Sequence, residues 1–231
     1  MWRSVAALAF AIVLLAPVAF AADPAPATPR TDGVRYLYLI RHGLYDRVEA
    51  PDDVSHNGLN ALGREQATLT GRRLASLPVK FGAFVTSDYL RARQTAEGIG
   101  RSLKRAADVD SLIHECAPPS EHAGSDSTEA LACESNLNAA WAKYARPSPA
   151  ADTHDLFVCH GNVIRWFVSH TLIDGGRAWR RMDVGNGSLT VIAIRPDATS
   201  RLVMFSDVGH LPLAKQSWAG KGAGWGTPPK R

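Results

Sequence analysis

The sequence predicts an α/β fold, a three-layer α/β/α sandwich around a mostly parallel central sheet. Two observations support this prediction. Short apolar runs alternate along the chain with longer segments whose apolar residues recur at helical spacing. The composition is that of an ordinary globular protein, with 45% apolar and 21% charged residues among 231. These proportions exclude a disordered chain, a collagen, a coiled coil and a multi-span membrane protein.

Three apolar runs, RYLYLI, GAFVT and DLFVC, are typical of strands that are buried on both faces of a parallel sheet. Two later runs, separated by a turn around Pro196 and Asp197, are expected to form a strand pair. The expected strands therefore span residues 35–40, 82–86, 155–159, 189–195 and 202–206.

Four segments have apolar residues at helical spacing, and we expect them to be helices. They span residues 62–77, 89–103, 129–144 and 163–172. Asn60 stands where the N-cap of the first helix is expected, and Pro78 follows the end of that helix. Strands that alternate with helices in this way are typical of a parallel sheet with helices on both faces.

The N-terminus predicts an export signal. Arg3 is followed by an uncharged, mostly apolar stretch, and Ala19-Phe20-Ala21 offers the small-x-small pattern of a signal peptidase site. We therefore expect residues 1–22 to be a signal peptide and the protein to be periplasmic or secreted. The alternative is a retained segment that anchors the protein to the membrane, because the stretch has nearly the length of a short span.

The remaining chain is expected to hold one domain. Residues 23–34 are rich in Pro and Ala and predict an extended linker, residues 35–214 form the domain, and residues 215–231 predict a flexible tail. The net charge of +4 comes from scattered basic residues, so no nucleic-acid partner is expected. Membrane contact is expected only if the N-terminal segment is retained.

The three cysteines are interpreted against an oxidising compartment. Cys116 and Cys133 could pair, but the sequence leaves this open because it does not supply the geometry. Cys159 lies in an apolar, strand-like run and is expected to be a buried free thiol. The chain has no Cys-x-x-Cys or His-x-His cluster, so we expect neither a metal site nor a cofactor.

Two histidines follow predicted strands directly. His42 comes after the strand at 35–40 and His160 after the strand at 155–159, and each is followed by a glycine, Gly43 or Gly161. Functional groups of open α/β sheets collect beyond the carboxyl ends of the strands, and a glycine there allows a ligand to approach closely. Two such strand exits in one sheet predict a site.

Arginines at the same edge point to an anion. Arg41 precedes the first histidine, and Arg91 falls in the first turn of a predicted helix, where the helix dipole favours anions and not cations. Two arginines, two histidines and helix N-termini predict a phosphate site that contains its own nucleophile. A carboxyl group is still needed as proton donor; Glu115 is the best-placed candidate and Glu121 is the rival.

Four ordered motifs carry a resemblance to a known family. They are the RHG of residues 41–43, an L-x-x-x-G-x-x-Q-A helix that begins at Leu59, an S-x-x-x-R-A-x-Q-T segment at 87–95 and the HGN of residues 160–162. Together they resemble the histidine phosphatase superfamily, with its phosphoglycerate mutase-like fold, over residues 35–212. Within it, the chain is most similar to the branch whose mitochondrial member is a serine/threonine protein phosphatase.

The resemblance implies a metal-independent phosphomonoester hydrolase that acts through a phosphohistidine on a phosphorylated protein or small molecule. It implies that His42 is the nucleophile and Glu115 the acid and base. His160 would be catalytic and would also hold the substrate phosphate. The other implied phosphate ligands are Arg41, Arg91, Gly43 and Asn162.

One departure and two alternatives accompany the resemblance. Leu44-Tyr45-Asp46 follows RHG where sugar-phosphate mutases and phosphatases usually have a Thr and an Asn, and this counts against a mutase. The first alternative is a sugar or nucleotide phosphatase, or a mutase, of the same fold. The second is a non-catalytic anion-binding module, although a receptor needs no nucleophile.

Overall fold

A computed structural model describes residues 33–47, 54–172 and 175–218. The predicted signal peptide and most of the predicted linker lie outside these residues. No helix in the described part of the chain is long and apolar enough to cross a membrane.

In the described part of the chain, six strands and four α-helices are joined by short connections that include three 3₁₀ helices. The strands are β1 (Arg35–Arg41), β2 (Phe81–Thr86), β3 (Asp108–Val109), β4 (Thr153–Cys159), β5 (Leu189–Ile194) and β6 (Ser200–Asp207). The α-helices are α1 (Ala61–Ala75), α2 (Leu90–Leu103), α3 (Thr128–Tyr144) and α4 (Gly161–Leu172). The 3₁₀ helices are η1 (Ser111–Ile113), η2 (Arg177–Arg181) and η3 (Leu213–Lys215).

The six strands form one mixed, mostly parallel sheet in the order β3-β2-β4-β1-β5-β6. The pairs β1–β4, β2–β4 and β2–β3 are parallel, whereas β5 runs antiparallel to both β1 and β6. The carboxyl ends of β1, β2 and β4, the three strands that precede the predicted site residues, therefore meet at one edge.

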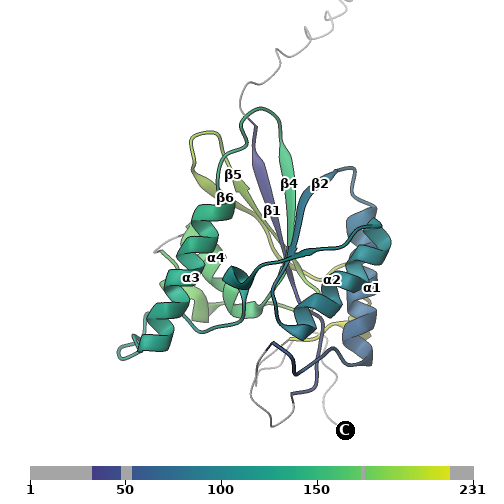
Figure 1. Ribbon diagram of the computed structural model, residues 1–231, viewed down its shortest axis with the longest axis horizontal. Coiled ribbons are helices and arrows are strands. Elements are labelled where there is room, and N and C mark those ends of the chain that lie inside the picture. Colours follow the sequence, from purple (N-terminus) through teal and green to yellow (C-terminus); the bar gives the residue numbers. More distant parts are fainter. Residues whose placement is uncertain (1–32, 48–53, 173–174, 219–231) are drawn as a thin grey trace, which may run out of the picture.

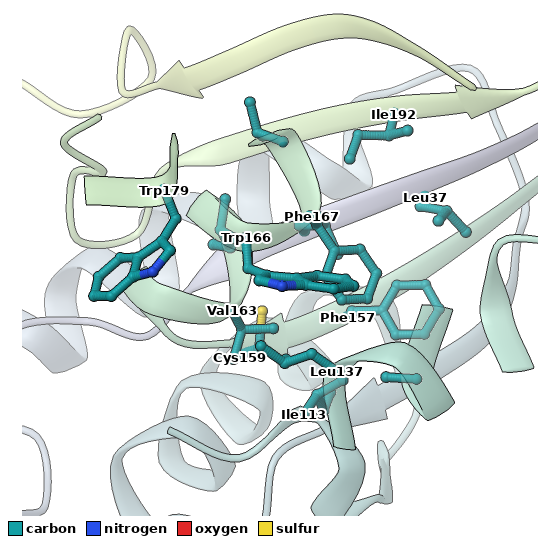
Figure 2. Packing of buried hydrophobic residues seen from close by; sticks show 14 of the residues in the cluster. Leu37, Ile113, Leu137, Phe157, Cys159, Val163, Trp166, Phe167, Trp179 and Ile192 are labelled. Carbon is teal, nitrogen blue, oxygen red and sulfur yellow. The ribbon is translucent and has the colours of Figure 1, made fainter. Parts of the chain in front are cut away.

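Helices cover both faces of the sheet, with α1 and α2 on one side and α3 and α4 on the other (Figure 1). Alternate residues of one strand enter different cores, as the two-residue period of a strand requires. Leu37 and Leu39 pack in the core beneath α3 and α4, and Tyr38 and Ile40 in the core beneath α1 and α2. Figure 2 shows the first core, where Trp166 and Phe167 of α4 lie close together. The predicted three-layer architecture is confirmed.

The expected elements are found with small shifts of their ends. Asn60 is the N-cap of α1, and its side-chain oxygen accepts a hydrogen bond from the backbone N–H of Gly63 at 2.9 Å. Strand β3 was not predicted, because two exposed residues carry no apolar pattern. The chain leaves α2 through Lys104, whose positive φ of 55° turns it towards this strand.

The ends of the domain differ from the prediction. The expected tail begins too early, since residues 215–218 pack on the domain: Gln66 Nε2 donates to the carbonyl of Lys215, and Trp218 forms a β-bridge with Gly185. Residues 219–231, the rest of that tail, lie outside the described residues. The last two residues of the expected linker also belong to the domain, because Gly33 bridges to Ser148 and Val34 is buried.

Two glycines allow α1 to approach the segment that follows β1. A Cβ on Gly43 would lie 2.4 Å from the carbonyl oxygen of Gly63, and a Cβ on Gly63 would lie 2.0 Å from that of Leu44. Real side chains do not fit at such distances, so both positions require glycine. The beginning of α1 thereby packs directly against the RHG segment.

Cys116 and Cys133 form a disulfide, with their Cα atoms 5.7 Å apart. The sequence had left this pairing open. Cys159 is a buried free thiol, as predicted, and burial raises its pKa.

Candidate active site

The register of two parallel strands brings the two histidines together. Arg41 of β1 is paired with Cys159 of β4, so His42 and His160 leave the sheet at the same level. The backbone N–H of His42 donates to the carbonyl of Cys159 at 3.0 Å, which extends the pairing by one bond. The two imidazole rings lie 5.1 Å apart, centroid to centroid.

The tautomer of His42 follows from its hydrogen bond. Its Nδ1 lies 2.8 Å from the carbonyl oxygen of Gly43, which only accepts, so Nδ1 carries the proton of the neutral ring. The lone pair is therefore on Nε2. Burial lowers the pKa of His42 well below its ordinary value, and the nearby charges of Arg41 and Arg91 lower it further. His42 is thus a neutral imidazole with a nucleophilic nitrogen at neutral pH.

The orientation of His160 depends on Ser87, at the end of β2. His160 Nε2 lies 2.8 Å from Ser87 Oγ, and that hydroxyl donates to Asp88 Oδ1, so it accepts from His160. Nδ1 is buried without a hydrogen-bond partner among the described residues, and Glu115 Oε2 lies 3.7 Å from it. Burial also lowers the pKa of His160, with the adjacent His42 as a further cause.

Two buried arginines flank the histidines. Arg41 Nη1 donates to the carbonyl of Val184, and its Nε has no partner among the described residues. Burial lowers the pKa of Arg41 to about 10, although Glu115 opposes this shift, and the group stays charged at neutral pH. Arg91 is 1% exposed, and its guanidinium carbon lies near two tyrosine rings, 4.7 Å from the centroid of Tyr45 and 4.6 Å from that of Tyr89.

The glycines after the two histidines have different tasks. The N–H of Gly43 donates to Thr95 Oγ1 at 3.0 Å, so this backbone is held in place by α2. Gly161 begins α4, and a Cβ there would lie 3.4 Å from Arg41 Nε. A side chain at position 161 would therefore contact this buried nitrogen of Arg41, which has no hydrogen-bond partner among the described residues.

The structure distinguishes the two candidate carboxylates. Glu115 lies in the same cavity as His42, whereas Glu121 forms an ion pair with Arg181, 2.5 Å away, and does not line that cavity. Glu115 is therefore the carboxyl group that the fold brings to the histidines.

Asn162 lines the cavity as well, but its amide group is engaged with the protein. Nδ2 donates to the carbonyl of Cys116 at 2.9 Å, and Oδ1 accepts from Arg165. Arg165 also donates to the carbonyls of Gly161 and Met182.

The cavity that Arg41, His42 and Glu115 share has a volume of about 140 Å³; His160 and Arg91 are buried beside it and are not among its lining residues. It is lined by Arg41, His42, Tyr45, Glu115, Gly161, Asn162, Arg165, Asp183 and Val184. A larger cavity of about 600 Å³ lies between α2 and the segment that leads to β3. The described residues that line the larger one include no histidine or cysteine, so we assign the chemistry to the smaller cavity.

Several residues of the site were not predicted. Tyr45 and Tyr89 orient Arg91, Ser87 orients His160, and Thr95 holds Gly43. The one sequence feature that could have suggested their role is that they lie within or next to the RHG and S-x-x-x-R-A-x-Q-T motifs. A tyrosine beside a motif, however, does not reveal which arginine it will contact.

His42, His160 and Glu115 offer metal-ligand atoms that all lie within 4.8 Å of one another. This trio could hold a metal ion by geometry alone. The positive charges of Arg41 and Arg91 disfavour a metal cation between these three side chains and favour an anion there. Arg41 Nε, a buried donor without a partner among the described residues, fits an oxygen of a phosphate group, and His160 Nδ1 does so when that ring is protonated.

Comparison with known proteins agrees with this chemistry. Residues 37–151 match the histidine phosphatase superfamily (branch 1). The chain is also 34% identical over 195 residues to the human mitochondrial serine/threonine-protein phosphatase PGAM5, covering 80% of this chain and 67% of that protein. The chain belongs to the histidine phosphatase superfamily. It is therefore a hydrolase of that superfamily, as the four motifs predicted.

Two further relatives extend the comparison for this histidine phosphatase. It is 36% identical over 202 residues to the mitochondrial serine/threonine-protein phosphatase Pgam5 of Caenorhabditis elegans, covering 82% of this chain and 68% of that one. Among solved structures, phosphoglycerate mutase from Plasmodium falciparum matches with a TM-score of 0.55 and 26% identity, covering 78% of this chain and 95% of that one. The phosphoglycerate mutase-like fold is confirmed.

Burial of two neutral histidines makes the stability of this phosphatase depend on pH. Because folding lowers the pKa of His42 and His160, the unfolded chain binds more protons below pH 6.5, and stability is lost as the pH falls through that value. The free energy of unfolding should fall between pH 7 and pH 5 by up to about 1.4 kcal/mol per pH unit for each histidine. Urea unfolding at pH 7, 6 and 5 measures this.

His42→Gln should flatten this pH dependence, and His122→Gln, a change at an exposed histidine, should leave it as in the wild type. Equal slopes for His42→Gln and the wild type would contradict the assignment of a buried neutral imidazole to His42.

Proposed function

We propose that this protein hydrolyses phosphomonoesters through a phosphohistidine on His42, without a metal, and that its substrates are phosphoserine or phosphothreonine side chains of proteins. One observation carries the proposal. The lone pair of a neutral, buried imidazole shares one cavity with the guanidinium of Arg41 and the carboxyl group of Glu115. A nucleophile, an anion-binding group and a proton donor are the parts that phosphoryl transfer requires.

In the first step, His42 Nε2 attacks phosphorus opposite the ester oxygen. The Nε2–P bond forms as the P–O bond breaks, and the departing serine or threonine oxygen takes a proton from Glu115. Arg41 and Arg91 hold the other phosphate oxygens, where charge spreads in the transition state, and His160 donates to them when the bound phosphate has raised its proton affinity. The product alcohol then leaves.

In the second step, Glu115 acts as a base. It takes a proton from a water molecule, whose oxygen attacks phosphorus as the Nε2–P bond breaks. This releases inorganic phosphate and returns His42 to its neutral form and Glu115 to its protonated form. The steps use only protein side chains and water.

The size of the cavity supports a protein substrate. Pockets that enclose a drug-sized molecule measure about 300–1,000 Å³. The present cavity, at about 140 Å³, suits a phosphoryl group at the end of a larger substrate. The similarity to protein phosphatases over 80% of the chain supports the same choice.

Replacing the proposed nucleophile should abolish turnover. His42→Ala should lower kcat for an aryl phosphate by a factor on the order of 10³ or more, because no other group in the cavity forms the intermediate. Arg41→Lys should cost about 100-fold, because a lysine lacks the fork that binds two oxygens. Both assays are run with a chelator present.

The intermediate itself is the second readout of this experiment. Rapid quench of the wild type with ³²P-labelled substrate should trap an acid-labile phosphate on His42. His42→Ala that turns over at the normal rate, or a chelator that stops the wild type, would contradict the mechanism.

A substrate panel tests the substrate class. We expect kcat/KM to be at least 10-fold higher for phosphoserine and phosphothreonine peptides than for sugar phosphates, nucleotides or phosphoglycerates, since the small cavity leaves the rest of the substrate outside. Free phosphoserine is the matched control for the peptides. A metabolite that is turned over faster than every peptide would favour the small-molecule alternative.

We also propose that the protein is exported and that residues 1–22 are removed. The signal pattern around Ala19-Phe20-Ala21 supports this, as does the Cys116–Cys133 disulfide, since disulfides persist in oxidising compartments. Sequencing of the mature protein should find a new N-terminus at Ala22 or Asp23, and Ala21→Arg should block the cleavage. A mature protein that begins at Met1 would favour the membrane-anchored alternative.

A further inference from the structure

The residue that follows Glu115 is held on two opposite sides. Cys116 is bonded through its sulfur to Cys133 of α3, and its carbonyl oxygen accepts a hydrogen bond from Asn162 Nδ2 of α4 at 2.9 Å. Glu115 itself lies in a segment without regular secondary structure, between η1 and α3. These two bonds fix the backbone of that segment one residue away from the carboxyl group.

The α3 side of this attachment extends along the whole segment. Asp110, before η1, accepts hydrogen bonds from Lys143 and from Tyr144, both in the last turn of α3. Ile113, in η1, is 2% exposed and belongs to the same core as Leu137, and the two lie near each other in Figure 2. The disulfide completes this set of contacts at the residue nearest to Glu115.

The α4 side connects Glu115 to a histidine. Asn162 is the second residue of α4, and His160 directly precedes that helix. Arg165 donates to Asn162 Oδ1, which turns the Nδ2 group of the same amide towards the carbonyl of Cys116. The backbone beside Glu115 is therefore held by the helix that follows His160, and Glu115 Oε2 lies 3.7 Å from His160 Nδ1.

We infer that Asn162 and the Cys116–Cys133 disulfide are positioning elements that hold Glu115 in place as the proton donor of the phosphatase reaction. This inference rests on the proposed function. The resemblance had implied that Asn162 is a phosphate ligand, and its hydrogen bonds assign it another task. Proton transfer to a leaving group depends on placement, and a displacement of about 1 Å costs as much as 100-fold in rate.

The dependence of rate on the leaving group separates the two roles. The p-nitrophenolate ion is a stable anion and leaves without a proton, whereas the oxygen of a phosphoserine peptide needs the proton of Glu115. The ratio kcat/KM reports the steps up to the first irreversible one, here formation of the phosphohistidine. The ratio kcat/KM is therefore unaffected by the later hydrolysis of the phosphohistidine, a step that needs Glu115 equally for both substrates.

Asn162→Ala should lower kcat/KM for a phosphoserine peptide by about 10- to 100-fold and leave that for p-nitrophenyl phosphate nearly constant. Glu115→Gln should show the same pattern. Its loss of kcat/KM on the peptide is the largest loss that a displaced Glu115 could cause. Arg41→Lys is the matched control, because loss of a phosphate ligand should lower both values by similar factors.

Reduction tests the disulfide in the unmodified protein. Dithiothreitol converts Cys116 and Cys133 to thiols as it becomes a cyclic disulfide. We expect this reduction to lower kcat/KM for the phosphoserine peptide reversibly and to leave kcat/KM for p-nitrophenyl phosphate nearly constant. The double variant Cys116→Ser, Cys133→Ser should have the lowered kcat/KM for the peptide without any reductant, and added reductant should not change it. If reduction unfolds the chain, which urea unfolding detects, the comparison of Asn162→Ala with Glu115→Gln decides.

Each outcome has a definite meaning. Equal losses on both substrates in Asn162→Ala would overturn the inference and make Asn162 a phosphate ligand. If kcat/KM for the peptide falls selectively in Glu115→Gln but neither in Asn162→Ala nor on reduction, the inference is also overturned. The proposed function would stand in that case. Full activity of His42→Ala would overturn the proposed function itself.

Discussion

The parallel pairing of β1 with β4 is the constraint on which the rest of the site depends. Because Arg41 is paired with Cys159, the next residues of both strands leave the sheet at one level, and two histidines 118 positions apart in the chain come within 5.1 Å, centroid to centroid. A slip of one residue would turn the alternate residues of a strand towards the wrong core. The hydrophobic pattern that stabilises the sheet therefore also fixes the distance between the two histidines.

The site concentrates positive charge on buried side chains. Arg41 and Arg91 are buried. Two carboxylates are among the described residues that line the cavity, the half-buried Glu115 and the exposed Asp183. Buried charges of one sign oppose folding, and the same charges lower the pKa of both histidines. In the proposed reaction, a phosphate dianion balances them on binding. Stability is thus given up locally for affinity towards the transferred group.

Much of the fold and of the site could be predicted because it rests on local patterns. The apolar runs that end in His42 and His160 identified two central strands and their functional ends. The features that were not predicted depend on which segments, far apart in the sequence, come into contact. Neither the stacking of Tyr45 on Arg91 nor the bond from Asn162 to Cys116 has a sequence signal, because each partner belongs to a different element. Strand β3 was missed since it is short and exposed.

The disulfide also changes how the chain is connected mechanically. Cys116 and Cys133 are 17 positions apart, so their bond closes a ring around the loop at the margin of the site. Force applied to that loop reaches Cys116, where the two sulfur atoms offer a path into α3 beside the backbone path towards Glu115. Within the ring, Pro118, Pro119 and Ser120 are buried and α3 begins at Thr128, so the exposed residues 121–124 are the ones that can change at a small cost to the site. A ring of this kind lets a protein alter what it recognises while it keeps the machinery of its reaction.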